Sequence, residues 1–160
     1  MFRLRKCLAN KNSLSNGIFM GSTIQRVLYP NGQLKTEAPL VNERIHGIKR
    51  DYHPNGQLAA EIPFDNGFSH GTAKLFALDG RLLGKWTSEH GTGVIKQWYN
   101  DGRLSSEVSI VKGLLTGRQK TWYEDGVPLP DCYWIRGKKV SRKQYITACE
   151  TDSELPRYND

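Results

Sequence analysis

Cysteine is scarce in this 160-residue chain, and its three cysteines cannot all pair with one another. Cys7, Cys132 and Cys149 form no Cys-x-x-Cys motif, so neither a disulfide framework nor a cysteine-based zinc site is indicated. Proteins of reducing compartments keep such cysteines as free thiols. The sequence therefore predicts a cytoplasmic location.

Long hydrophobic runs are also missing. Apolar residues make up 38% of the chain, which is below the usual share for a globular domain. No stretch is long enough to cross a bilayer as a helix. Residues 1–7 carry basic side chains, but no apolar stretch of signal-peptide length follows them. We therefore expect neither a signal peptide nor a transmembrane helix, and the length suggests one domain.

Catalytic motifs are absent as well. The chain contains no Gly-x-Ser-x-Gly nucleophile elbow, and the sequence positions no histidine partner for its cysteines. We therefore predict no catalytic residue and no cofactor, and we do not expect an enzyme.

The chain is rich instead in one repeated turn. Its clearest copy is Tyr52-His53-Pro54-Asn55-Gly56-Gln57-Leu58, which joins an aromatic residue, a tight turn and a leucine. The turn glycines of the five copies are spaced by 24, 24, 22 and 24 residues; they are Gly32, Gly56, Gly80, Gly102 and Gly126. The interval after the third copy is thus two residues short. A fixed period of this size indicates stacked supersecondary units.

Asn-Gly and Asp-Gly pairs between apolar runs indicate β-hairpins, because these residues tolerate a positive φ. A three-residue loop pairs Tyr52 with Leu58, whereas a two-residue loop would pair Tyr52 with Ala59. We predict the three-residue loop, since it places apolar against apolar side chains in each regular unit. The same loop pairs Phe76 with Leu82 and Trp98 with Leu104.

The predicted fold class is all-β: an elongated single antiparallel sheet of about five β-hairpin repeats, hence about ten strands, with a short C-terminal capping helix. We expect a basic N-terminal arm or capping strand in residues 1–21 and the repeats in residues 22–140. Residues 141–160 are expected to form the capping helix, starting with a Ser141–Gln144 capping box, and a mobile acidic tail.

Period-two alternation from this loop predicts two faces. Arg50, Tyr52 and Ala60 would share an apolar face, and Lys49 would lie opposite Glu61 on a wet face. Two columns would then run along the apolar face. The aromatic column is Leu28, Tyr52, Phe76, Trp98 and Trp122, and the basic column is Arg26, Arg50, Lys74, Lys96 and Lys120.

These columns are the candidate partner-binding site, with a structural alternative for each. The aromatic rings can cover one another as core, and the basic stems can lie over small residues such as Ala60. A short helix cannot seal about ten strands, however, so part of the face is expected to stay open. The predicted binding residues are Arg50, Tyr52, Lys74, Phe76, Lys96, Trp98, Lys120 and Trp122.

Histidines do not indicate a metal site. His46 and His70 occupy the same place in neighbouring repeats, about 10 Å apart if two strands separate them. Zinc ligands must each reach within about 2 Å of one centre. We therefore interpret these histidines as part of the repeat and predict no metal.

The unit aromatic-x-x-(Asn/Asp)-Gly-x-Leu, with a spacer such as Asn66-Gly67-Phe68-Ser69-His70-Gly71, resembles the MORN-type repeat over roughly residues 22–145. It is most similar to the bacterial variant of YwqK-family antitoxins. The resemblance implies a protein-binding scaffold, here an antitoxin or immunity protein that neutralises a toxin. As an alternative, it implies an adaptor on anionic membranes or a tether for other proteins. The net charge of +7 is concentrated at the chain ends, which argues against a nucleic-acid partner.

Overall fold

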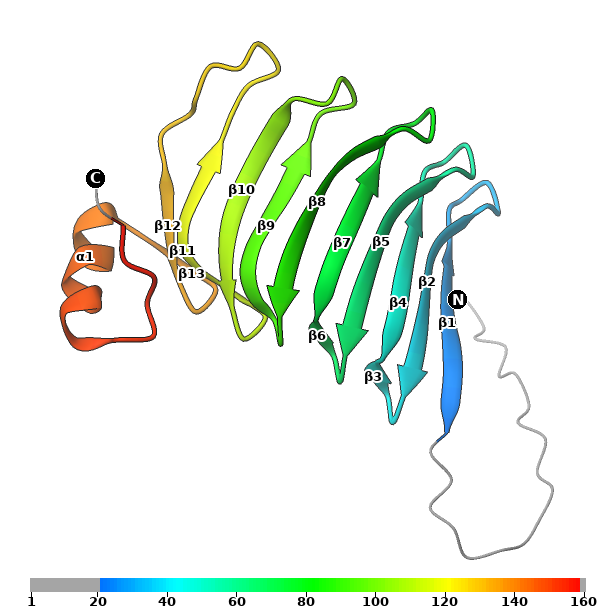
Figure 1. Cartoon of the computed structure of the whole chain (residues 1–160), viewed down its shortest axis with the longest axis horizontal. Coiled ribbons are helices and arrows are strands. Elements are labelled where there is room, and N and C mark those ends of the chain that lie inside the picture. Colours follow the sequence, from blue (N-terminus) through cyan, green and yellow to red (C-terminus); the bar gives the residue numbers. More distant parts are fainter. Residues whose placement is uncertain (1–20, 159–160) are drawn as a thin grey trace, which may run out of the picture.

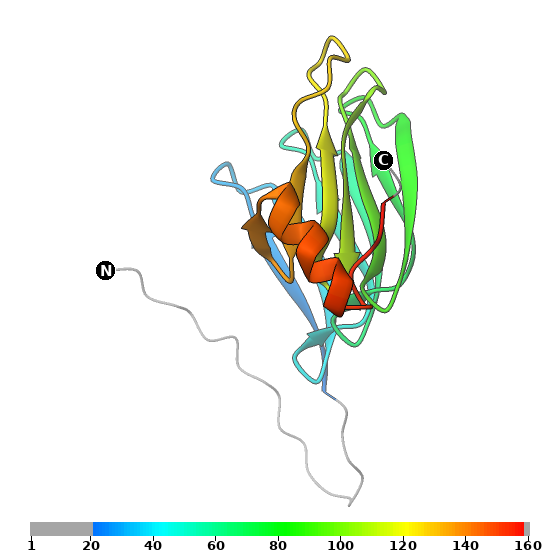
Figure 2. The same ribbon diagram turned by 90° about the vertical axis from the view of Figure 1, so that its left-hand side faces the viewer.

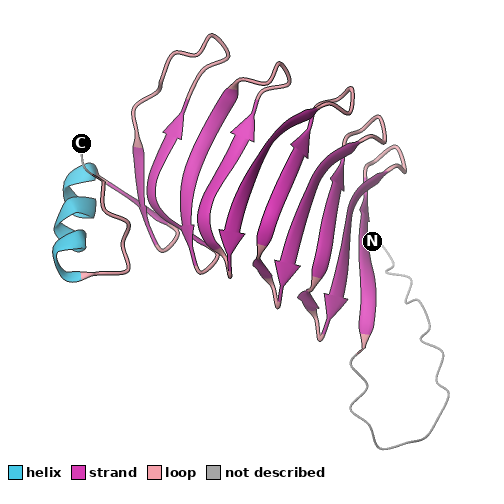
Figure 3. Cartoon of the chain, viewed as in Figure 1, coloured by secondary structure: helices cyan, strands magenta, loops and turns pink. Residues whose placement is uncertain are grey.

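The computed structural model describes residues 21–158, which form one open antiparallel sheet with a helix at its C-terminal end (Figures 1 and 3). The elements are β1 (Ser22–Leu28), β2 (Leu34–Val41), β3 (Arg44–Ile45), β4 (Gly47–Tyr52), β5 (Leu58–Asp65), β6 (Phe68–Ser69), β7 (Gly71–Phe76), β8 (Leu82–Glu89), β9 (Thr92–Trp98), β10 (Leu104–Val111), β11 (Leu114–Thr121), β12 (Cys132–Ile135), β13 (Lys138–Val140) and α1 (Arg142–Thr151). The predicted fold class is confirmed.

Strands follow one another across the sheet in chain order, as in a meander. The main path runs β1-β2-β4-β5-β7-β8-β9-β10-β11-β12-β13, while the short strands β3 and β6 pair with β2 and β5. The count of about ten strands was too low because β3, β6 and β13 are short extensions at the spacer turns and at the C-terminal edge. Each hairpin repeat therefore contacts mainly its two neighbours, as in other repeat proteins.

The hairpin tips have the predicted three-residue loop. The His53 N–H donates to the Gln57 carbonyl at 2.8 Å, and the Gly56 N–H donates to the His53 carbonyl at 2.8 Å. Gly56 has a φ of 84°, the left-handed conformation that closes this turn. Tyr52 pairs with Leu58. The equivalent pairs are Leu28–Leu34, Phe76–Leu82, Trp98–Leu104 and the isolated bridge Trp122–Pro128.

The register changes immediately after each of the first four tips. Tyr52 pairs with Leu58, but the next pair is Asp51 with Ala60, so Ala59 is an extra residue in β5. This β-bulge shifts the pairing by one residue and therefore exchanges the faces. Arg50, not Lys49, lies opposite Glu61. The predicted Lys49–Glu61 pair is wrong, because strict period-two alternation from the tip does not allow for the extra residue of the bulge.

Neighbouring repeats are joined by hydrogen bonds at their tips. The hydroxyl groups of Tyr29 and Tyr99 donate to the carbonyl oxygens of Tyr52 and Trp122, both at 2.7 Å. At the opposite ends of the strands, the Gly113 N–H donates to the carbonyl of Gly91 at 2.9 Å. Neighbouring units are thus joined by hydrogen bonds at both ends of their strands, in addition to the backbone hydrogen bonds between paired strands.

The short unit differs from the others at its spacer turn. Between β2 and its return strand the pairing passes from Glu37–Arg50 to Leu40–Ile45, so the return strand contains two extra residues. In unit three, by contrast, the Ser88–Gly93 pair is followed directly by the Glu89–Thr92 pair. The two residues missing from the 22-residue interval are therefore those of the spacer bulge.

A hydrophobic cluster lies at the C-terminal end, where α1 packs on β12. Tyr133, Tyr145 and Leu155 are buried there, and Figure 2 shows α1 in front of the last strands. The predicted capping box is confirmed: the Gln144 N–H donates to Ser141 Oγ at 3.2 Å, and the Ser141 N–H donates to Gln144 Oε1 at 2.9 Å.

The expected mobile tail is wrong for residues 152–158, which fold back onto the sheet. Leu155 is 3% exposed, and the Tyr158 hydroxyl lies 2.9 Å from Ser109 Oγ. Arg136 contacts Asp152 at 2.7 Å. Hydrogen bonding from Arg136 holds the pKa of the Asp152 carboxyl below its ordinary value. The expectation for the N-terminal arm falls on residues 1–20, outside the described residues.

Candidate binding surface

A row of charged side chains crosses the sheet perpendicular to the strands, and we call it the charge ladder. Its members are directly paired or adjacent across the strands; in order they are Arg26, Glu37, Arg50, Glu61, Lys74, Lys85, Lys96, Glu107 and Lys120. Residues paired across strands lie on the same face. The basic column and the glutamates between its members therefore form one surface.

Opposite charges alternate over most of this ladder and form ion pairs. Arg26 contacts Glu37 at 2.8 Å, and Arg50 contacts Glu61 at 3.2 Å. Lys74 reaches the second oxygen of Glu61 at 3.7 Å. These pairs are partly exposed, so each contributes at most about 1 kcal/mol to stability.

The alternation fails in the middle of the sheet. Lys85 occupies the place that Glu37, Glu61 and Glu107 hold in the other regular units, and it pairs with Lys74. The β8–β9 register, continued from the Ser88–Gly93 pair, places Lys85 next to Lys96. Three consecutive positions of the ladder are therefore basic, with no carboxylate between them.

The structure separates residues that were expected to lie together. Gly84 and Lys85 are successive residues of β8, so they point to opposite faces. A Cβ added at Gly84 would overlap the Trp98 indole, which therefore lies against the face opposite the ladder. The expectation that the basic stems lie over the small residues is therefore wrong. Tyr52, Phe76, Trp98 and Trp122 are each half-buried.

Sequence reasoning missed a histidine cluster at the spacer turns. The rings of His70 and His90 have centroids 4.4 Å apart. Asp65 lies 3.2 Å from His46 Nδ1 and 3.8 Å from His90 Nδ1. The feature of the sequence that could have indicated this cluster is His90, which lies in the short spacer turn. Within residues 21–158, no three histidine, cysteine, aspartate or glutamate side chains are arranged to hold a metal ion.

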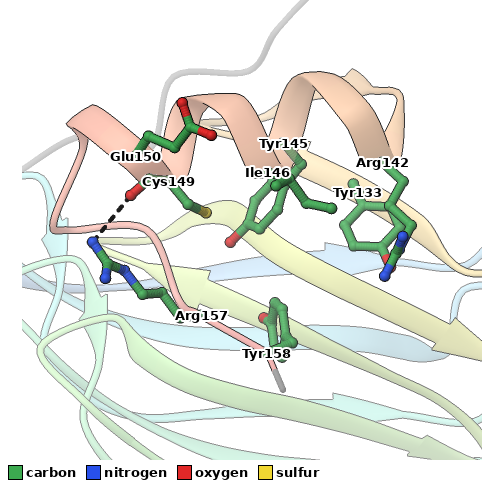
Figure 4. A pocket seen from close by; sticks show the side chains of 8 residues that line it. All are labelled: Tyr133, Arg142, Tyr145, Ile146, Cys149, Glu150, Arg157 and Tyr158. Atoms are coloured by element: carbon green, nitrogen blue, oxygen red, sulfur yellow. Dashed lines mark hydrogen bonds between the residues drawn. The ribbon is translucent and has the colours of Figure 1, made fainter. Parts of the chain in front are cut away.

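A second feature is a hollow of about 790 Å³ between α1 and the returning chain (Figure 4). It is lined by Tyr133, Arg142, Tyr145, Ile146, Cys149, Glu150, Arg157 and Tyr158. The Tyr145 hydroxyl donates to the Pro156 carbonyl at 2.7 Å, and burial raises the pKa of this phenol. No histidine lines the hollow, so a cysteine–histidine pair of the kind that activates a thiol nucleophile is not formed there.

Comparison with known families connects these repeats to one of them. The sequence model described as a MORN repeat variant matches residues 24–42 and 45–66, which are two adjacent repeats of the sheet. Repeats of this type generally bind proteins or membranes. No curated protein matches the chain. The described residues include no helix that has both the length and the apolar character needed to cross a membrane.

Proposed function

We propose that this chain is a non-enzymatic protein-binding scaffold. One observation carries the proposal: in residues 21–158, α1 and the returning chain pack against the last strands, and no second layer covers β4 to β9 (Figures 1 and 2). The charge ladder is exposed or half-buried along these strands. A large open surface with charged and aromatic groups is suited to a protein partner.

The two columns have different roles in this proposal, and they are tested separately because Trp98 lies against the face opposite the charge ladder. Half-buried aromatic side chains such as Phe76 and Trp98 supply apolar area, together with exposed residues near the tips such as Leu82, which is 43% exposed. Basic residues such as Lys74 and Lys96 attract the partner and set its orientation. Interfaces of this kind depend most on a few aromatic or arginine anchors.

The test is a pull-down with the tagged full chain from the native host, followed by binding kinetics on the captured protein. We expect Trp98→Ala to speed dissociation and Lys74→Glu to slow association, more strongly at low salt. Lys138→Glu is the control, because Lys138 is exposed on β13, outside β4 to β9. Loss of binding in Trp98→Ala alone would place the partner on the face opposite the ladder. If Lys138→Glu abolishes binding while the two folded test variants bind like the parent, the proposed binding surface is wrong.

We further propose that the partner is a toxin which the chain neutralises. The support is the resemblance of the repeat and its spacer, Asn66-Gly67-Phe68-Ser69-His70-Gly71, to YwqK-family antitoxins. Expression of the captured partner alone in a bacterial host should arrest growth, and co-expression of this chain should restore it. A captured partner that is harmless on its own would refute the antitoxin role and leave the scaffold role standing.

The second candidate function is an adaptor on anionic membranes, favoured by the net charge of +7. At the end of the sheet that α1 covers, however, two basic residues form ion pairs within the chain. Arg136 contacts Asp152 at 2.7 Å, and Lys112 contacts Glu154 at 2.6 Å. Co-sedimentation with phosphatidylserine vesicles at physiological salt tests this candidate. We expect the protein to stay in the supernatant. The cytoplasm stays the proposed location, supported by the odd number of cysteines.

A further inference from the structure

The three lysines in the middle of the charge ladder are an exception to an otherwise regular pattern. Acidic residues separate the basic ones at three places, but Lys85 stands where the fourth acid is expected. Like charges directly opposite each other destabilise a sheet. Lys74 and Lys85 are nevertheless paired across β7 and β8, so this site lacks the carboxylate that neutralises its counterparts.

The lysine side chains are accessible. Lys74 and Lys85 are exposed, and Lys96 is half-buried. Lys74 reaches Glu61 at only 3.7 Å, and its side chain is 46% exposed. Because neighbouring strands lie about 4.8 Å apart, the three lysines span about 10 Å across the sheet. An anionic group placed over Lys85 would therefore lie near all three ammonium groups.

A row of small polar and aliphatic residues runs beside the lysines on the same face. Thr72 and Thr87 are exposed, and their hydroxyl groups lie 3.1 Å apart. Val94, two residues before Lys96, is 40% exposed. The surface beside the positive charge thus offers hydroxyl groups and apolar area, which is the mixture that a protein segment can use.

We propose that Lys74, Lys85 and Lys96 form the docking site for an acidic segment of a partner protein, whose carboxylates take the place of the missing glutamate. The proposal rests on the protein-binding function and adds the chemistry of the partner. Glu61 and Glu107 border the lysines on the same row. These carboxylates would repel the continuous phosphates of a nucleic acid or an anionic membrane, whereas a short acidic segment fits between them.

The experiment measures binding of a fluorescein-labelled decaglutamate peptide to the full chain by fluorescence anisotropy. We expect Lys85→Glu to weaken this binding by about tenfold or more, because it reverses the charge at the centre of the site. Lys138→Glu makes the same change in net charge at an exposed position of β13. It should alter binding by less than about twofold if the ladder is the site.

The melting temperature of Lys85→Glu shows whether this variant is folded. Lys85→Glu restores the alternation of charges, so its melting temperature should equal or exceed that of the parent. Loss of binding with unchanged or higher stability therefore supports the site. Absence of decaglutamate binding to the parent, or equal losses in Lys85→Glu and Lys138→Glu, overturns it. Binding to phosphatidylserine vesicles that Lys85→Glu abolishes also overturns it, in favour of a lipid surface.

The partner captured for the proposed function separates the two ideas. If that protein binds Lys85→Glu as tightly as it binds the parent, the acidic docking site is wrong and the scaffold function stands. If no protein is captured while decaglutamate still binds through Lys85, the site is supported and the scaffold function fails.

Discussion

Replacing Gly56 by valine tests the geometry of the hairpin tips. Gly56 has a φ of 84°, and no heavy atom lies within 4 Å of the position where a Cβ would stand. The substitution thus creates no clash, and its whole cost is the strain of a β-branched residue in the left-handed conformation. That strain is about 1–3 kcal/mol. For a chain of this size it corresponds to a fall in melting temperature of roughly 2–12 °C.

The assay is thermal unfolding followed by circular dichroism, with two comparison variants. Gly56→Asn should cost less than Gly56→Val, since asparagine tolerates the left-handed region. Gly84→Ala should also destabilise, but for the opposite reason: the backbone there needs no glycine, and the added Cβ meets the Trp98 indole. A Gly56→Val variant that melts with the parent would show that the tip does not require a positive φ.

Hydrogen exchange adds a spatial test of the same variant. Because repeats contact mainly their neighbours, the loss of stability should be concentrated near the altered tip. Amides of β4 and β5 should exchange faster in Gly56→Val, while those of β10 and β11 keep the protection of the parent. Uniform loss of protection over all strands would contradict the view that the units are only locally coupled.

Two further predictions concern contacts between distant parts of the chain. Tyr99→Phe removes the hydroxyl that donates to the Trp122 carbonyl and should lower the free energy of unfolding by about 0.5–1.5 kcal/mol in urea titrations. Tyr123→Phe, at a tyrosine 55% exposed, should change it little, and equal effects would exclude a role for the Tyr99 bond. Arg136 lowers the pKa of Asp152, so the stabilisation exists above the ordinary carboxyl pKa of about 4 and is lost as the pH falls below it. Near-ultraviolet circular dichroism should therefore show that the returning chain loosens in acid. Arg136→Ala should weaken that pH dependence, while the Lys112–Glu154 ion pair remains; an identical acid transition in the variant would refute the assignment.

The repeat and its turns could be predicted from the sequence because their chemistry is local. Asparagine or aspartate followed by glycine determines the tip, and the side chain of Asn55 accepts from the Gln57 N–H at 3.1 Å. The capping box of α1 is equally local, since Ser141 and Gln144 are three residues apart. In these places the residues that determine the structure are also neighbours in the sequence.

The faces could not be predicted, because a bulge leaves little trace in the residue pattern. Ala59 has no property that marks it as the unpaired residue in β5, yet it decides which residues share a face with Arg50. With the shift, Glu61 becomes the partner of Arg50, and the basic column becomes a row of alternating charges. The available clue was the glutamate that follows three of the four small residues, Thr36, Ala60 and Ser106.

The returning chain at the C-terminus was missed for a different reason. Tyr158 contacts Ser109 and Arg118, which lie 49 and 40 residues earlier in the chain. Acidic composition suggested a solvated tail, but Leu155 and Tyr158 have apolar surface that the sheet can cover. Long-range packing of this kind depends on where the sheet ends, and no local sequence motif predicts it.

The hydrogen bonds between tips have a consequence for the evolution of the chain's length. Each bond from Tyr29 to Tyr52, or from Tyr99 to Trp122, joins one unit to the next, 23 residues away. No bond of this type spans more than one unit boundary in the part of the chain that the structure describes. A duplicated unit that carries the donor, as the units of Tyr29, His53 and Tyr99 do, would therefore find a backbone acceptor in the unit that follows it. The sheet can gain or lose hairpins without a new core, and the area available to partners grows in steps of one unit.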